Sequence, residues 1–226
     1  MSSRARSVDP GVPLKTIIFD FDGTLVDTFA SIFEIANRIA PEFGYRPVMA
    51  DEIDTLRRWP YRKISSHLGV AWHKLPAIAA RIRTELSGQL EHLPLVPGVA
   101  YVLSKLQAQG LELGILTSNA RENVERFLVA RGIEEFAFVD CSSSLWGKRH
   151  RLKSLLERQG RTVDEVAYVG DEVRDIEAAQ ALGIVMVAVT WGFTHPELLA
   201  AHAPSHLVEH PLDLLDVFAR PPDRSL

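Results

Sequence analysis

The stretch DFDGTLVDT, residues 20–28, decides the fold and the site that this chain is expected to have. It follows an apolar run from Thr16 to Phe19, which reads as a buried strand, so the carboxylates of Asp20 and Asp22 stand where that strand ends. Unpaired buried carboxylates are costly, and the pair therefore predicts a site that holds a cation, a shared proton or both. The glycine that follows allows a sharp turn close to a ligand, and Thr24 is expected to hydrogen-bond back and lock that turn.

The composition is that of a globular chain with room for a large core. The 226 residues, 46% of them hydrophobic, can form one large domain or a main domain with an insert. A net charge of -4 and a pI near 6.1 provide no broad basic surface, so we expect no nucleic-acid partner. The single cysteine, Cys141, excludes an intramolecular disulfide and fits a reducing compartment. No apolar signal segment or run of ~20 apolar residues occurs, which predicts a cytoplasmic protein without a membrane partner.

Short apolar runs alternate with helical patterns along most of the chain. Five such runs read as strands: Thr16 to Phe19, Leu113 to Leu116, Ala137 to Val139, Glu165 to Val169 and Val185 to Val189. Continuous apolar strands separated by helices indicate a parallel sheet that is covered on both faces. The predicted fold class is therefore α/β, a doubly wound parallel sheet with a Rossmann-like core.

Residues 29–94 interrupt this alternation, because they contain helical patterns without a credible strand. Ser31 to Ala40 and Ala77 to Leu90 are amphipathic at helical spacing. Four prolines break the segment: Pro41, Pro47, Pro60 and Pro76. We therefore predict a small all-helical domain at 29–94, inserted into an α/β core at 14–28 and 95–218, with flexible tails at 1–13 and 219–226.

Polar residues also follow the later strands. Thr117 and Ser118 end one apolar run, and Asp171 with Asp175 follows another. Lys148 begins the helical pattern that lies between these two runs in the sequence. Each feature alone is also explained by a helix cap or a solvated lysine. Ligands of open α/β sheets nevertheless bind outside the carboxyl ends of the strands, which is where these side chains would meet.

Taken in order, these segments resemble the haloacid dehalogenase superfamily, in its phosphoglycolate phosphatase-like branch with a helical cap after the first strand. The resemblance spans about residues 15–215 and is carried by two motifs: Asp20-x-Asp22-Gly23-Thr24-Leu25-Val26-Asp27-Thr28 and Gly170-Asp171-x-x-x-Asp175. It implies a phosphoric monoester hydrolase that acts on a small phosphorylated metabolite.

The resemblance also implies a role for each site residue. Asp20 would be the nucleophile that forms a phosphoaspartyl intermediate, and Asp22 would be the general acid and base. The phosphate-binding residues would be Thr117, Ser118, Lys148 and Gly23. The ligands of a Mg²⁺ cofactor would be Asp20, the backbone carbonyl of Asp22, and Asp171, with Asp175 orienting bound water.

Alternatives remain open at this point. Asp22 argues for phosphoryl transfer, because a departing halide needs no proton, but a sugar phosphomutase would keep the same aspartates. A phospho-ligand sensor without turnover is the alternative from another class. The lysine assignment could shift to Lys153, and Glu172 stands where a small hydroxyl or amide residue is more usual in the family.

Two other stretches carry charged or metal-binding side chains. Residues 57–63, RRWPYRK, could meet an anionic group of the substrate, although a solvated basic face is the simpler interpretation. The stretch HLVEH at residues 206–210 spells an inverted zinc-protease pattern. That pattern needs a helix, whereas the flanking prolines and the Leu207-Val208 pair favour a short terminal strand.

Overall fold

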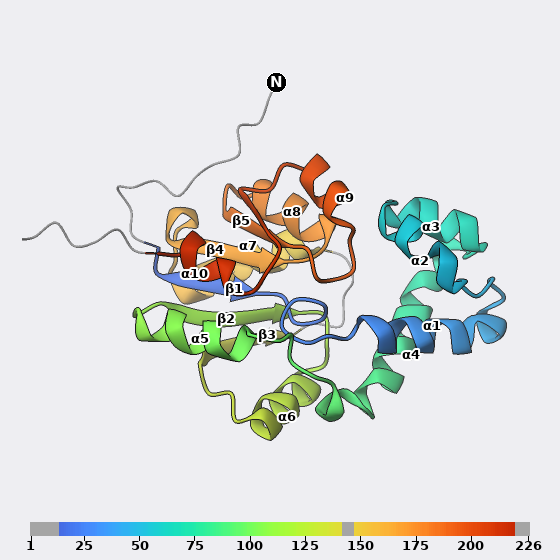
Figure 1. Ribbon diagram of the computed structural model, residues 1–226, viewed down its shortest axis with the longest axis horizontal. Helices are drawn as coiled ribbons and strands as arrows, with labels where there is room; N and C mark the ends of the chain where they lie inside the picture. The colour runs from blue at the N-terminus through green and yellow to red at the C-terminus, as the bar shows by residue number, and fades with distance from the viewer. Residues whose placement is uncertain (1–13, 142–146, 220–226) are drawn as a thin grey trace, which may run out of the picture.

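The structure, a computed structural model, describes residues 14–141 and 147–219. Apart from the exposed Ala219, the predicted tails lie outside these residues. The described chain contains a six-stranded sheet in which every pairing is parallel, in the order β3-β2-β1-β4-β5-β6 (Figure 1). The strands are β1 (Thr16–Phe19), β2 (Glu112–Thr117), β3 (Phe136–Cys141), β4 (Val166–Gly170), β5 (Val185–Val189) and β6 (His206–Val208).

Helices cover both faces of the sheet. Successive residues of a strand point to opposite sides, so each strand contributes apolar side chains to both layers of helices. Ile17 and Phe19 of β1 join the apolar cluster that includes α5, α6 and α10, whereas Ile18 joins the cluster under α7, α8 and α9. These helices are α5 (Val99–Ala108), α6 (Arg121–Arg131), α7 (Lys148–Gln159), α8 (Val173–Gln180), α9 (Pro196–Ala201) and α10 (Asp213–Val217), with the short 3-10 helix η4 (Val163–Glu165) before β4. The predicted doubly wound α/β fold is confirmed.

The strand predictions hold, with small differences at the ends. β1 and β5 have the predicted bounds, β2 and β3 are longer at both ends, and β4 begins and ends one residue later than predicted. The stretch from His206 to Val208 forms the edge strand β6, so the zinc-protease pattern does not lie on a helix. Within 14–141 and 147–219, no helix has both the length and the apolar character needed to cross a bilayer.

Residues 29–94, all of which the structure describes, contain helices and turns but no strand. We call this segment the helical insert; it lies beside the sheet in Figure 1. Its helices are α1 (Phe29–Phe43), η1 (Ala50–Glu52), α2 (Ile53–Arg57), α3 (Tyr61–Leu68), η2 (Trp72–Lys74), α4 (Leu75–Ser87) and η3 (Leu90–His92).

Two of the four prolines do not break a helix as predicted. Pro41 lies in the last turn of α1, which continues to Phe43 and ends at Gly44 in the left-handed conformation. Pro76 lies in the first turn of α4, where a proline is tolerated because the backbone N–H groups there have no partner within the helix. Sequence pattern alone predicts α1 and α4 but not their ends, and it does not locate α2 and α3.

The two chain crossings between the insert and the sheet run side by side. Val26 and Leu95 form an antiparallel bridge, and the Val96 N–H donates to the Leu25 carbonyl at 2.9 Å. The Asp27 N–H donates to the Pro94 carbonyl at 3.1 Å. The insert therefore leaves and re-enters the α/β layer through one short paired segment.

Candidate active site

The candidate site lies at the carboxyl ends of β1, β2 and β4. The strand order reverses beside β1, because the chain adds β2 and β3 on one side of it and then β4 on the other. Such a switch leaves an open crevice at the sheet edge, where ligands of α/β folds bind. Asp20 follows β1, Asp171 follows β4, and Thr117 is the last residue of β2.

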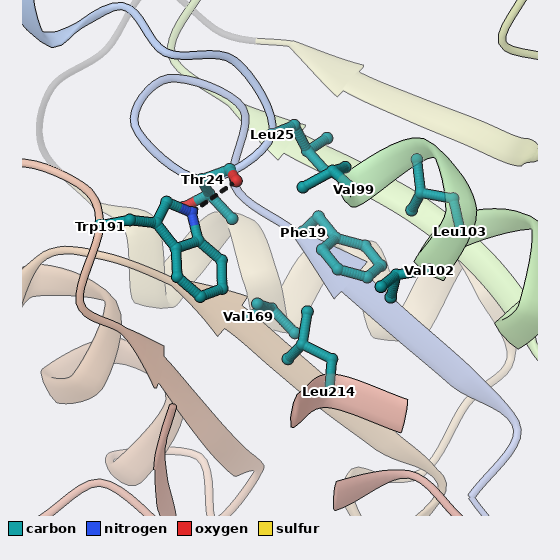
Figure 2. A pocket seen from close by; sticks show the side chains of 9 residues that line it. All are labelled: Phe19, Thr24, Leu25, Val99, Val102, Leu103, Val169, Trp191 and Leu214. Carbon is teal, nitrogen blue, oxygen red and sulfur yellow. Dashed lines mark hydrogen bonds between the residues drawn. The ribbon is translucent and has the colours of Figure 1, made fainter. Parts of the chain in front are cut away.

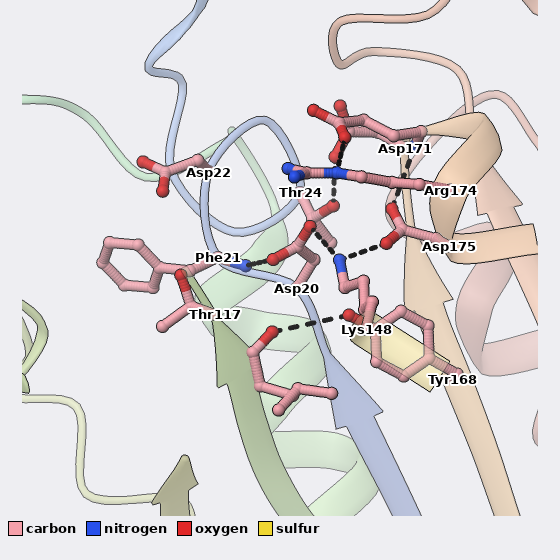
Figure 3. Close-up of polar contacts among 12 residues, drawn as sticks. Asp20, Phe21, Asp22, Thr24, Thr117, Lys148, Tyr168, Asp171, Arg174 and Asp175 are labelled. Carbon is pink, nitrogen blue, oxygen red and sulfur yellow. Dashed lines mark hydrogen bonds and ion pairs between the residues drawn. The ribbon is translucent and has the colours of Figure 1, made fainter. Parts of the chain in front are cut away.

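A buried lysine joins two of the predicted carboxylates (Figure 3). Lys148 Nζ donates to Asp20 Oδ2 at 2.7 Å and also pairs with Asp175 Oδ1. The Phe21 backbone N–H donates to the other oxygen of Asp20 at 2.9 Å. Lys153, the alternative lysine, is exposed on α7, so the structure places Lys148 in the cluster.

Asp171 is fixed through both of its oxygens. The Thr24 hydroxyl donates to Oδ1 and the Phe193 backbone N–H donates to Oδ2, each at 2.7 Å. We expected Thr24 to lock its own turn, but its hydroxyl instead reaches across to the neighbouring strand end. Carboxylate oxygens of Asp20, Asp171 and Asp175 all lie within 4.8 Å of one another, and all three residues are buried.

Burial and mutual repulsion set the charge state of this cluster. Burial first, then the charges of Glu172 and Asp20, raises the pKa of Asp171 well above its usual range. Burial raises the pKa of Asp175 to about 6, even though Lys148 acts in the opposite direction. Burial alone would lower the pKa of Lys148, but Asp175 and Asp20 outweigh it and raise that pKa well above its usual value. The cluster therefore holds a protonated lysine among crowded carboxyl groups.

Asp22 has different surroundings from Asp20, although only Phe21 separates them. Its carboxyl points away from the lysine cluster in Figure 3, and Asn119 Nδ2 approaches Asp22 Oδ2 at 3.3 Å. Burial, and then the charge of Asp20, raises the pKa of Asp22 to about 7. A carboxyl with such a pKa can both donate and accept a proton near neutral pH.

The predicted phosphate-binding residues border the same crevice. Thr117 is fully buried, with its hydroxyl accepting from the Asn119 N–H at 3.0 Å, and Ser118 next to it is half-buried. Gly23 has φ of 76°, and a Cβ there would lie 2.6 Å from Asp171 Oδ2. Its N–H donates to the Val26 carbonyl within the turn. The observed effect of Gly23 is close packing against Asp171, and a phosphate contact from it stays a prediction.

Glu172 faces the interior rather than solvent. It is buried and pairs with Arg174. The charges of Glu172 and Asp175 raise the pKa of Arg174 above its usual value despite its burial. Arg174 therefore adds a second cation beside the cluster, next to Asp171 in Figure 3.

Each cation of residues 57–63 has a partner within the protein. Arg57 donates to the backbone carbonyls of Gly192 and Phe193, and Arg58 pairs with Asp54 and Glu197. Arg62 lies over the Trp72 ring at 5.2 Å, and Lys63 lies over the Trp59 ring at 3.8 Å. These contacts account for the basic stretch without a substrate anion.

An apolar pocket lies against the turn that follows β1 (Figure 2). Its lining is Phe19, Thr24, Leu25, Val99, Val102, Leu103, Val169, Trp191 and Leu214. Trp191 Nε1 donates to the Thr24 carbonyl at 3.1 Å, which ties the loop after β5 to the turn after β1. Apolar walls are unsuited to a phosphate, so this pocket serves packing rather than substrate binding.

Sequence reasoning missed three residues that orient the site: Asn119, Phe193 and Arg174. Arg174 lies inside the Gly170–Asp175 motif and Asn119 directly follows Ser118, so position was a signal for both. Phe193 acts through its backbone N–H, which no side-chain pattern reveals.

Comparison with known proteins assigns the chain to a family. The sequence profile of haloacid dehalogenase-like hydrolases matches residues 17–189. The chain belongs to the haloacid dehalogenase-like hydrolase family. It is similar to a phosphoglycolate phosphatase of Synechococcus elongatus, at 42% identity over 89% of this chain and 96% of the relative. The resemblance seen in the sequence is thereby confirmed, and the protein is a phosphatase of this family.

More distant relatives share the same extent. An N-acetylmuramic acid 6-phosphate phosphatase of Pseudomonas aeruginosa is 26% identical over 92% of this chain and 96% of its own length. A haloacid dehalogenase-like hydrolase of Streptococcus pneumoniae, of known structure, has a TM-score of 0.73 at 22% identity and covers 91% of this chain and 98% of its own. That likeness shows the fold.

Proposed function

We propose that this haloacid dehalogenase-like phosphatase is Mg²⁺-dependent and hydrolyses phosphoglycolate, or a closely similar small phosphomonoester, through a phosphoaspartyl intermediate on Asp20. The observation that carries the proposal is the gathering of Asp20, Lys148, Asp171 and Asp175 in one buried cluster, with Asp22 and its raised pKa beside it. The 42% identical phosphoglycolate phosphatase supports the choice of substrate.

Two displacements at phosphorus make up the reaction that we propose. An oxygen of Asp20 attacks the phosphorus, the bond from phosphorus to the ester oxygen breaks, and Asp22 gives its proton to the departing alkoxide. Water then attacks the phosphorus of the acyl phosphate while Asp22 takes one of its protons, which releases inorganic phosphate and restores Asp20. Lys148 and the Thr117–Ser118 segment balance and orient the phosphoryl oxygens.

The residues of the cluster fit Mg²⁺. Three buried carboxyl groups offer hard oxygen ligands within 4.8 Å of one another, and their mutual repulsion needs a cation beyond Lys148. Asp20, Asp171 and the backbone carbonyl of Asp22 would hold the ion, and Asp175 would orient its water. When bound, Mg²⁺ supplies charge that stabilises the phosphoryl group during transfer.

We further propose that the helical insert, residues 29–94, is a cap over an α/β core formed by residues 14–28 and 95–218. The paired crossings at Val26 and Leu95 support a common hinge, because they hold both connections in one place. Arg57 brings the insert into contact with the core, because its guanidinium donates to the backbone carbonyls of Gly192 and Phe193. A cap that closes there would exclude water from the phosphoryl group.

A panel of phosphomonoesters tests the proposal. Phosphate release is measured for phosphoglycolate, N-acetylmuramic acid 6-phosphate and a hexose phosphate, with Mg²⁺ or EDTA. We expect selective release from phosphoglycolate that EDTA and Asp20→Asn both abolish. Release that survives in Asp20→Asn contradicts the covalent mechanism. Isomerisation of the sugar phosphate without net release would favour a mutase.

A further inference from the structure

Arg57, the last residue of α2, connects the insert to the loop at residues 190–195, which we call the β5–α9 loop. Its guanidinium donates from Nη2 to the Gly192 carbonyl at 2.7 Å and from Nε to the Phe193 carbonyl at 3.1 Å. The guanidinium also lies over the Phe29 ring at 5.3 Å, and that ring packs against Phe193 at 5.5 Å. One planar side chain thus holds two successive carbonyls of the core and the first residue of α1.

The same loop holds Asp171 from the other side. The Phe193 N–H donates to Asp171 Oδ2, and the Trp191 indole donates to the carbonyl of Thr24, whose hydroxyl donates to Asp171 Oδ1. Both oxygens of Asp171 are therefore fixed by groups that the β5–α9 loop either contains or contacts. A shift of this loop would release the carboxyl from both sides.

Packing makes the loop and the carboxyl move together. A Cβ on Gly192 would lie 2.1 Å from Asp171 Oδ2, so the loop backbone passes directly against the carboxyl. A Cβ on Gly23 would meet both Asp171 Oδ2 and the Phe193 ring at 2.6 Å. With no space for independent adjustment, displacement of the loop is transmitted to Asp171.

We propose that Arg57 is a positioning residue for Asp171, so that docking of the insert on the core and cation binding at Asp171 favour each other. This inference rests on the proposed function, because it assigns to Asp171 a place among the ligands of Mg²⁺. Coupling of two equilibria is reciprocal: if Arg57 strengthens cation binding, the cation strengthens docking of the insert by the same factor. The insert thereby contributes to a site from which it supplies no ligand.

Arg57→Met tests the inference, because it keeps the aliphatic stem and removes the donors. Its backbone carbonyl still accepts from the His195 N–H, at 3.0 Å, so the anchoring of α2 by the backbone remains. Arg58→Met is the matched control. Arg58 is adjacent and also joins the insert to the core through an ion pair with Glu197, but its side-chain hydrogen bonds go to Asp54 and Glu197 rather than to the β5–α9 loop.

Two measurements without substrate read the coupling. Calorimetric titration with Mg²⁺ is expected to show about 5- to 10-fold weaker binding for Arg57→Met and unchanged binding for Arg58→Met. Hydrogen exchange at the Phe193 amide of the metal-free protein is expected to be at least about fivefold faster in Arg57→Met alone. Arg57→Lys, which keeps the charge but not the fork, is expected to fall between.

Wild-type Mg²⁺ affinity together with wild-type exchange at Phe193 in Arg57→Met would overturn the inference. If Arg57→Met is unfolded at the assay temperature, the same two measurements on Arg57→Lys test the inference instead. Failure of the proposed function is seen separately: the wild-type protein would then release no phosphate from the panel, whatever Arg57 does to cation binding. A protein that hydrolyses phosphoglycolate and binds Mg²⁺ equally well with and without the Arg57 donors refutes the inference alone.

Discussion

Asp20 and Asp22 show how surroundings separate two identical side chains. Asp20 accepts from Lys148 and from the Phe21 N–H, whereas Asp22 points away from the lysine and has a pKa raised to about 7. A nucleophile must be ionised and a general acid must carry a proton, so this difference matches the two proposed roles.

Asp22→Asn removes the proposed proton donor without changing the size of the side chain. We expect kcat/KM for phosphoglycolate to fall about 10²–10⁴-fold. In the wild-type protein kcat/KM should fall as pH rises through the pKa of Asp22, because the acid loses its proton, and that descending limb should be absent in the variant. With p-nitrophenyl phosphate, whose leaving group needs less protonation, the loss should be smaller. An equal loss with both substrates would argue against general acid catalysis by Asp22.

Lys148→Met leaves Asp20 and Asp175 without their cation. Breaking a buried ion pair by removing one partner typically costs about 3–5 kcal/mol, and the metal-free variant should unfold in urea with a stability loss of about that size. The control is Lys153→Met on the same helix: its ammonium is exposed, 3.8 Å from Glu157, and the change should be within about 0.5 kcal/mol. Similar urea midpoints for the two variants would contradict the assignment of Lys148 to the cluster.

At the level of turns and loops, the site depends on close packing around Asp171. Gly23 and Gly132 both have positive φ, of 76° and 63°, but a Cβ would clash only at Gly23, because nothing lies within 4 Å of the one built at Gly132. Gly132→Ala should therefore cost only the left-handed conformation, about 1–2 kcal/mol. Gly23→Ala should cost about 1–3 kcal/mol more, measured by urea unfolding, because Asp171 and Phe193 must move. Equal losses would show that the turn can relax away from Asp171.

Patterns of neighbouring residues were enough to predict the strands and the placement of Asp20 and Asp171 at strand ends, whereas Lys148 was assigned through the family resemblance. Apolar runs mark strands that are buried on both faces, and the strand-end rule brings their polar neighbours together. The partner of Thr24 and the contact from Phe193 could not be predicted in this way. Both join segments more than a hundred residues apart or use a backbone group, so neither leaves a periodic or compositional signal.

Across the whole molecule, the raised pKa values link stability to pH. Asp22 and Asp175 titrate at about 7 and about 6 in the folded protein, against about 4 in an unfolded chain, and the pKa of Asp171 is also raised. Between about pH 4 and pH 7 these three carboxyls bind more protons in the folded state than in the unfolded state, which outweighs the opposite effect of His206, so we expect the stability of the metal-free protein to fall as pH rises. The carboxyls with lowered pKa, such as Glu52 and Glu165, act below this range.

Thermal unfolding in EDTA should therefore give a Tm at pH 8 that is lower than at pH 5, by roughly 5 °C. Mg²⁺ at about 100 times its Kd should add about 2.7 kcal/mol. The increase in Tm at a fixed Mg²⁺ concentration should be larger at pH 8, because a cation at these oxygens competes with protons. A Tm that rises from pH 5 to pH 8 without metal would contradict the assignment of raised pKa values to the cluster.

The central claim is that Asp20 carries the phosphoryl group during turnover. Rapid acid quench of the protein mixed with phosphoglycolate and Mg²⁺, followed by peptide mass spectrometry, measures this directly. We predict a phosphorylated peptide with the modification on Asp20, which disappears as substrate is exhausted and is absent in Asp20→Asn and with EDTA. Turnover with no phosphoryl group on the protein under pre-steady-state sampling, or with the group on another residue, would contradict the account.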